Sequence, residues 1–431
     1  MKYLPIPTQL FLDNRQKLVA KLKPNSIAIF NANDIMPTNA DGQMLFRQNN
    51  DLFYFTGIDQ EETILIIFPD APKSEWKEIV FIKETSETIA IWEGHKLTKE
   101  QAEEVSGIKS VCWISELESL LPQLILEAEY VYLNTNEHIR SSNQVQTRDT
   151  RFIEMVKQKY PLHKLERLAP IMNELRAIKH TIEIELIKTA IDITTKAFYR
   201  TLKFIKPEVT EYQVEAEIAH EFLWNRATRH AYTPIVASGA NACVLHYIDN
   251  NQVLKDGDLV LMDFGAEYAN YAADLTRTIP VNGRFSLRQK AVYEAVLHIQ
   301  KEARKLLIVG NNFEAYNKSV GKIVEQELIK LKLLNADEVA KQEEKKPLYK
   351  KYFMHGTSHF LGLDVHDVGS RFSKFEAGMV FTCEPGIYIK DEGIGIRLEN
   401  NILITETGNI DLTENIPIES ADIERLMKNN C

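Results

Sequence analysis

Two acidic residues, Asp263 and Asp274, lie at equal distances from a predicted turn, and this symmetry restricts how the chain can fold. Asp263 ends the apolar run 259–262, and Asp274 lies in a second extended stretch that closes before Asn282. The midpoint of the pair falls at 267–270, where a turn is expected. Extended runs joined by a short connection predict a β-hairpin, in which the two carboxylates would be cross-strand neighbours.

Glu384 and Glu399 are arranged in the same way about a second turn. Their midpoint lies between Asp391 and Glu392, inside the polar segment 390–393, which apolar runs flank on both sides. Directly opposed side chains in a hairpin lie roughly 4.5–5.5 Å apart at Cβ. Carboxylates at that spacing reach two cations about 3.5–4 Å apart, and without cations they would repel each other. The sequence therefore predicts a shared metal pocket; the alternative for each residue alone is a solvated group near a turn.

Length and composition set the expected number of domains and exclude two classes of partner. The chain has 431 residues, more than the roughly 250–300 at which a single core stops growing, so two domains are expected. A net charge of −10 argues against general binding to nucleic acid or an anionic membrane. No apolar run approaches the ~20 residues needed to span a bilayer. The four cysteines include no CxxC pair, which fits a reducing compartment, and we expect a cytoplasmic protein.

The pattern of apolar and charged residues divides the chain into two parts and predicts an α+β protein. The first part alternates short β-type runs with charged helical stretches, which is typical of an α/β domain. These runs are 26–30, 63–68 and 78–82. Helical periodicity covers 173–205, and strand-like runs dominate 232–280. We expect an N-terminal domain over residues 1–172 and a C-terminal domain over residues 173–431.

The densest chemical motif is the segment 355–367, which holds three histidines and two aspartates in thirteen residues. Neutral imidazole is a common ligand of transition metals and titrates near neutral pH, so such a cluster can both bind an ion and move protons. His355 and His359 are not interpreted as a helical zinc-protease pair, because the glutamate of the HExxH pattern is missing. A different metal geometry is expected, with His359 as the fifth candidate ligand beside the four carboxylates.

Several motifs together resemble the proline-specific metallopeptidases with the pita-bread fold, and within them aminopeptidase P. These motifs are 261–265, 271–278, 355–367, 382–386 and 395–400. The segment 46–57 is similar to the N-terminal domain of the same family, so the resemblance covers essentially the whole chain. It implies a creatinase-like N-terminal α/β domain followed by a pita-bread catalytic domain.

The resemblance implies a pair of divalent metal ions, most often Mn²⁺. Asp263 would chelate one ion, Asp274 and Glu399 would bridge both, and His359 and Glu384 would hold the other. An oxygen-rich ligand set without thiolates suits Mn²⁺. The implied reaction releases the N-terminal residue from peptides with proline in the second position, through a hydroxide held by the two metal ions.

The resemblance also implies three catalytic residues. Glu384 is the expected proton carrier between the attacking hydroxide and the leaving nitrogen. His246 and His366 match positions that hydrogen-bond the substrate and stabilise the developing oxyanion. For His246 alone, the alternative is a structural histidine whose hydrogen bonds are satisfied within the fold.

Further matching positions lie on the proline side of the cleft. His355, Tyr388 and Arg397 are the expected substrate-binding residues there. Arg397 precedes Glu399 by two residues on the same strand face, so contact between Arg397 and a ligand carboxylate is expected, and Tyr388 could equally be an aromatic residue on a half-buried strand. Trp92 resembles an N-domain aromatic that caps the active site of a neighbouring subunit, with core packing as the alternative.

Two other functions share parts of this sequence pattern. Prolidase, which splits only Xaa-Pro dipeptides, has the same metal ligands, but Ser358-His359 followed by 362–364 favours aminopeptidase P. A pita-bread domain that only binds peptides or proteins is the second alternative, although such domains usually lack ligands that are present here. The resemblance implies a homo-oligomer, either a dimer or a tetramer.

Overall fold

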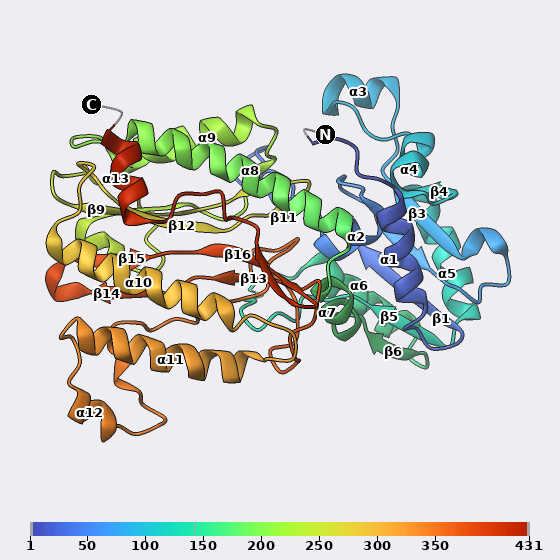
Figure 1. Cartoon of the computed structure of the whole chain (residues 1–431). Coiled ribbons are helices and arrows are strands. Elements are labelled where there is room, and N and C mark those ends of the chain that lie inside the picture. Colours follow the sequence, from blue (N-terminus) through green and yellow to red (C-terminus); the bar gives the residue numbers. More distant parts are fainter. Residues whose placement is uncertain (1–2, 143, 429–431) are drawn as a thin grey trace. The chain divides into compact units, whose positions relative to one another are not determined.

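The computed structural model describes residues 3–142 and 144–428, which form two compact units (Figure 1). One unit spans Leu4–Arg176, and the other begins at Ala177 and includes Tyr3. Each unit has its own sheets and its own buried residues.

The helical stretch expected over 173–205 is two helices rather than one. Helix α7 (Ala169–Ala177) ends where the second unit begins, and α8 (Thr181–Phe204) starts after a three-residue break. His180 caps α8, because its Nδ1 accepts a hydrogen bond from the backbone N–H of Ile182. The expected domain boundary after residue 172 falls inside α7, four residues before the division between the units.

The first unit is built on a six-stranded mixed sheet with strand order β4-β3-β2-β1-β5-β6. The strands are β1 (Ser26–Asn31), β2 (Ile64–Ile67), β3 (Glu78–Ile82), β4 (Ser110–Trp113), β5 (Tyr130–Leu133) and β6 (Lys164–Arg167). The three runs expected as strands are β1, β2 and β3. β1 is buried along its whole length, as a central strand covered on both faces should be.

The helices of the first unit complete its α/β character. They are α1 (Gln9–Val19), α2 (Asn50–Thr56), α3 (Glu87–Glu93), α4 (Lys99–Ser106), α5 (Leu117–Glu127), α6 (Arg148–Lys159) and most of α7. Side chains of α5 and α6 join those of the central strands in one apolar core, which includes Ile29, Ile66, Leu124 and Val156. The expected alternation of strands and helices is therefore confirmed.

The second unit holds the predicted hairpins. Its strands are β7 (Arg229–His230), β8 (Ile235–Ser238), β9 (Leu259–Phe264), β10 (Ala266–Tyr268), β11 (Tyr271–Ala272), β12 (Leu275–Pro280), β13 (Val380–Cys383), β14 (Gly386–Ile389), β15 (Ile394–Arg397), β16 (Asn400–Thr405) and β17 (Gly408–Asp411). They form small antiparallel sheets, with strand orders β12-β9-β8, β11-β10-β7, β13-β16-β17 and β14-β15.

Helices bracket these strands (Figure 1). They are α8, α9 (Glu211–Trp224), α10 (Leu287–Lys305), α11 (Phe313–Lys330), α12 (Ala336–Ala340) and α13 (Ser420–Lys428). Figure 1 shows the strands between the α8–α9 pair, in green, and the α10–α11 pair, in orange. Within the described part of the chain, no helix has the length and apolar character required to cross a membrane.

Candidate metal centre

The hairpin that carries Asp263 and Asp274 forms, but its register differs from the expected one. β9 and β12 pair antiparallel with Asp263 opposite Thr276 rather than opposite Asp274. The turn is the pair Ala269 and Asn270, whose φ angles are 50° and 64°, as a two-residue hairpin turn of the primed type requires. It is centred one residue later than expected, which shifts the pairing by two. The two aspartates are therefore diagonal neighbours on one face of the hairpin, a spacing that their side chains still bridge.

The second hairpin has the expected register. Cys383 pairs with Asn400 on one side, and Gly386 pairs with Arg397 on the other. Counting inward from either pair places Glu384 opposite Glu399, where the two strands bend between one sheet and the next. The predicted facing arrangement of this pair is confirmed.

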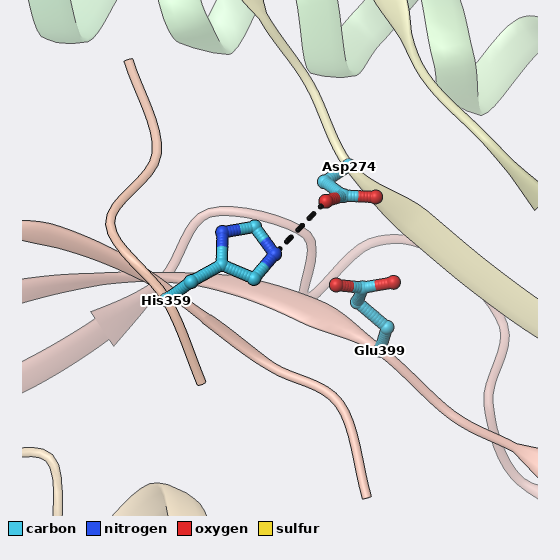
Figure 2. Close-up of side chains that lie close together, drawn as sticks. All are labelled: Asp274, His359 and Glu399. Atoms are coloured by element: carbon cyan, nitrogen blue, oxygen red, sulfur yellow. Dashed lines mark ion pairs between the residues drawn. The ribbon is translucent and has the colours of Figure 1, made fainter. Parts of the chain in front are cut away.

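His359 joins the carboxylates from a third segment. Its Nε2 lies 3.4 Å from Asp274 Oδ2 and 3.6 Å from Glu384 Oε1. Its Nδ1 lies 2.9 Å from the carbonyl of Phe360, so the proton belongs on Nδ1 and the Nε2 lone pair faces the carboxylates. Ligand atoms of Asp274, His359 and Glu399 all lie within 4.8 Å of one another (Figure 2). Three segments far apart in sequence thus place metal-ligand atoms in one small volume.

The electrostatics of this cluster fit bound cations. Burial raises the pKa of Asp274, Glu384 and Glu399 well above their ordinary values, and the negative charge of neighbouring carboxylates raises them further. Glu399 Oε1 is buried and has no hydrogen-bond partner in the described part of the chain. Buried carboxylates that lack donors need protons or metal ions in their place, so the residues present suit a divalent ion with oxygen and imidazole ligands.

A hydrogen-bonded chain connects the three residues expected on the proline side to Asp263. Arg397 Nη2 donates to Asp263 Oδ2, and its Nη1 donates to the Tyr388 hydroxyl at 2.9 Å. Tyr388 lies in turn 2.8 Å from His355 Nε2. Among the candidate ligand carboxylates, the one that Arg397 contacts directly is therefore Asp263. The Nε of Arg397 donates a hydrogen bond to the Thr276 hydroxyl, which in turn donates to Glu399 at 2.7 Å. Arg397 is thus linked to Glu399 through Thr276.

Comparison with known proteins decides the family. The model of metallopeptidase family M24 matches residues 185–406, and the model of the aminopeptidase P N-terminal domain matches residues 11–132. The Xaa-Pro aminopeptidase of Haemophilus influenzae is 36% identical over 434 residues, which cover 98% of both chains. The chain belongs to the aminopeptidase P family.

Solved structures of aminopeptidase P confirm the predicted fold. Aminopeptidase PepP of Pseudomonas aeruginosa matches with a TM-score of 0.90 and 32% identity, covering 99% of each chain. The Zn-substituted aminopeptidase P of E. coli in complex with product matches with a TM-score of 0.88 and 34% identity, covering 99% of this chain and 100% of that one. This family member therefore consists of an N-terminal aminopeptidase P domain and a pita-bread metallopeptidase domain, and it is a metal-dependent hydrolase.

In this aminopeptidase P family member, the predicted residues His366 and His246 lie at different distances from the cluster. The ring of His366 packs edge-on against that of His359, with centroids 4.2 Å apart. His246 is exposed, and a positive charge on it would lower the pKa of His355. The structure thus brings His366 into the cluster and leaves His246 at its margin.

Trp92 lies on α3 of the first unit with 84% of its surface exposed. The alternative that Trp92 packs in the core is therefore wrong.

Tyr232 is the main residue of the site that the sequence did not reveal. Its hydroxyl lies 2.6 Å from one oxygen of Asp263 and 2.6 Å from one oxygen of Asp274. Burial, followed by the charge of these carboxylates, raises the pKa of Tyr232 far above its usual value, so it remains a neutral phenol. A single tyrosine between two short strands carries no spacing signal. Only the folded hairpin shows that it joins two ligand candidates.

Proposed function

We propose that this protein is an Xaa-Pro aminopeptidase that releases the N-terminal residue from peptides with proline in the second position. The observation that carries the proposal is the convergence of Asp274, His359 and Glu399 within 4.8 Å. This cluster lies in a chain that aligns end to end with Xaa-Pro aminopeptidases.

Two divalent ions, which we propose to be Mn²⁺, would occupy the cluster. Asp263 would hold one ion, Asp274 and Glu399 would bridge both, and His359 and Glu384 would hold the other. Cys383 is not a ligand in this proposal, because burial raises its pKa to about 12 and keeps it a thiol. When bound, such ions lower the pKa of a water molecule and polarise the scissile carbonyl.

The protein's own groups would move the protons and hold the substrate. Glu384 would take a proton from the attacking water and pass it to the leaving nitrogen. His366 and His246 would donate hydrogen bonds to the substrate. His355 would bind as a neutral imidazole at neutral pH, because burial and the nearby Arg397 lower its pKa to about 3.

A substrate panel tests the proposed function. The protein should be freed of metal by chelation, reloaded with one metal at a time, and assayed on Xaa-Pro-Xaa tripeptides, on the matching Xaa-Pro dipeptides and on Xaa-Ala-Xaa peptides. We expect rapid cleavage of the Xaa-Pro-Xaa tripeptides alone, with Mn²⁺ the best activator. Hydrolysis restricted to dipeptides would assign a prolidase, and binding without hydrolysis under every metal would assign a non-catalytic domain.

Replacing Tyr232 by phenylalanine should weaken metal binding without emptying the site. The phenol contacts Asp263 and Asp274 but is not itself in the proposed ligand set, and loss of such an outer contact typically costs about 10–100-fold in metal affinity. Titration of the chelated variant with Mn²⁺ measures this change. An affinity equal to that of the wild type would show that the carboxylates hold their positions without the phenol.

We also propose a homo-oligomer, dimer or tetramer, located in the cytoplasm. The exposed side chains of Trp92 and Ile91 on α3, with 84% and 79% of their surfaces accessible, support a contact with another subunit. Light scattering of the purified protein, with and without Trp92→Ala, tests the oligomer.

The cysteines support the proposed location in the cytoplasm. The three described cysteines are free thiols, which agrees with a reducing compartment.

A further inference from the structure

A buried ion pair lies in the metallopeptidase unit outside the proposed ligand set. Lys179 Nζ lies 3.0 Å from Asp367 Oδ2, and only 1% of each side chain is exposed. A buried pair of this kind stabilises little in itself, but removing one partner leaves an uncompensated charge in the interior. Its place in the chain is informative, because Asp367 directly follows His366.

The Asp367 end of the pair closes the loop that carries both site histidines. The backbone N–H of Asp367 donates to the carbonyl of Phe360 at 3.0 Å, so the segment between them forms a compact loop with His359 just before it and His366 near its end. Gly362 packs directly against the Asp367 carboxylate. A Cβ on this residue would lie 2.1 Å from Asp367 Oδ2 and 2.9 Å from Lys179 Cε, so a larger residue would displace the ion pair. The loop is therefore folded tightly around the ion pair.

The Lys179 end is anchored in the break between α7 and α8. The backbone N–H of Lys179 donates to the carbonyl of Gly378 at 2.9 Å, and Ile178 forms a β-bridge with Met379. Both partners lie just before β13, the strand that leads to Glu384. The ammonium group therefore extends from a fixed backbone position rather than from a free chain end.

The same helix start also holds the other arm of the site. Glu183, in the first turn of α8, is buried and accepts a hydrogen bond from the Tyr271 hydroxyl at 3.1 Å. Tyr271 belongs to β11, three residues before Asp274. Lys179 and Glu183 thus connect one rigid element to the histidine loop and to the aspartate hairpin.

We propose that Lys179 is a positioning residue that, through Asp367, holds the 359–367 loop so that His366 faces the scissile bond beside His359. This inference rests on the proposed peptidase function. Loss of either charge would remove the 3.0 Å ion pair that holds the Asp367 carboxylate against the Lys179 ammonium, and the loop that carries Asp367 would shift. Because His366 is bonded to Asp367 in the chain, that movement displaces its imidazole. A displacement of about 1 Å in a reacting group can cost about 100-fold in rate.

The test is a double-mutant cycle on Lys179→Met, Asp367→Asn and the double variant. Each single variant should lower kcat by about 10–100-fold while KM changes by less than about 3-fold, and the amount of bound metal should equal that of the wild type. Both substitutions remove the same contact, so the double variant should be at least as active as the less active of the two single variants. Losses in kcat that multiply in the double variant would overturn the proposal.

Asp51→Asn serves as the matched control. Asp51 pairs with Arg176 at 2.7 Å in the first unit, with 17% and 4% of the side chains exposed, so this variant also removes the acidic partner of a largely buried ion pair. We expect a lower Tm with unchanged kcat per bound metal. If Asp367→Asn shows the same pattern as this control, the Lys179–Asp367 pair only stabilises the fold, and the positioning role is wrong.

A measurement without substrate separates this inference from the proposed function. The visible absorption spectrum of the Co²⁺-loaded protein reports the geometry around the ion, and His359 begins the loop that the ion pair holds. Asp367→Asn should shift the band, whereas Asp51→Asn should not. If the wild type cleaves no Xaa-Pro peptide, the proposed function is wrong, but the spectral test can still be carried out. An unshifted band in Asp367→Asn would then contradict the positioning role of Lys179.

Discussion

Replacement of Glu384 by alanine is expected to lower kcat on an Xaa-Pro-Xaa peptide by about 10³-fold or more. The residue has two proposed tasks, because its carboxylate is a metal ligand and also the proton carrier, and proton transfer alone contributes about 10²–10⁴-fold. The structure places one oxygen 3.6 Å from His359 Nε2 and raises the pKa of the group through burial and the charge of Glu399. Steady-state kinetics together with metal analysis of the same sample measures both tasks.

The companion variants separate the two tasks of Glu384. Glu384→Gln keeps the size of the side chain and one oxygen ligand, so it should retain more metal than Glu384→Ala while losing nearly as much kcat. Glu392→Ala is the control on the same hairpin, because Glu392 pairs with Arg288 near the surface at 2.7 Å and lies in the turn. Its activity should equal that of the wild type. Unchanged hydrolysis by Glu384→Ala would remove Glu384 as the proton carrier.

The two hairpins show what the sequence could predict about this site and where it was inaccurate. In the second hairpin the turn can be located from the sequence, because the segment 390–393 is polar and ends in a glycine. In the structure this residue, Gly393, adopts a φ of 62°. Symmetry about that turn then placed Glu384 opposite Glu399 correctly. In the first hairpin the two turn residues are Ala269 and Asn270, and alanine rarely adopts a positive φ. The midpoint estimate therefore missed the turn centre by one residue and the register by two.

Contacts between distant segments account for what the sequence could not show. Helical periodicity continues through 178–180, but backbone pairing of Lys179 with Gly378 breaks the helix there, and no local signal reports a partner so far along the chain. Tyr232 and Thr276 join the site for the same kind of reason: each is a common residue whose hydroxyl is aimed at a carboxylate only after the strands pair. Motif resemblance supplied the family, whereas the hydrogen bonds around the ligands needed the fold.

Removal of metal by chelation is expected to abolish peptidase activity and to lower the Tm of the metallopeptidase unit, with a larger decrease at about pH 8 than at about pH 5.5. The folded, metal-free unit keeps Asp274, Glu384 and Glu399 at pKa values above those of the unfolded chain. It therefore binds more protons than the unfolded chain, so its free energy of unfolding decreases as pH rises above about 4. Bound cations replace those protons and oppose this decrease.

Glu399→Gln tests this explanation because it should separate metal binding from stability. The amide cannot ionise, so the chelated variant should unfold at a higher temperature than the chelated wild type at about pH 8, although it binds metal more weakly. At about pH 5.5, where the raised pKa keeps more of the wild-type carboxyl protonated than at about pH 8, the two chelated proteins should differ less. Calorimetry at both pH values, with and without chelator, gives four Tm values for each of the two proteins. Equal decreases in Tm on chelation of the wild type at both pH values would contradict this explanation. They would show that the fold accommodates the buried carboxylates without bound cations.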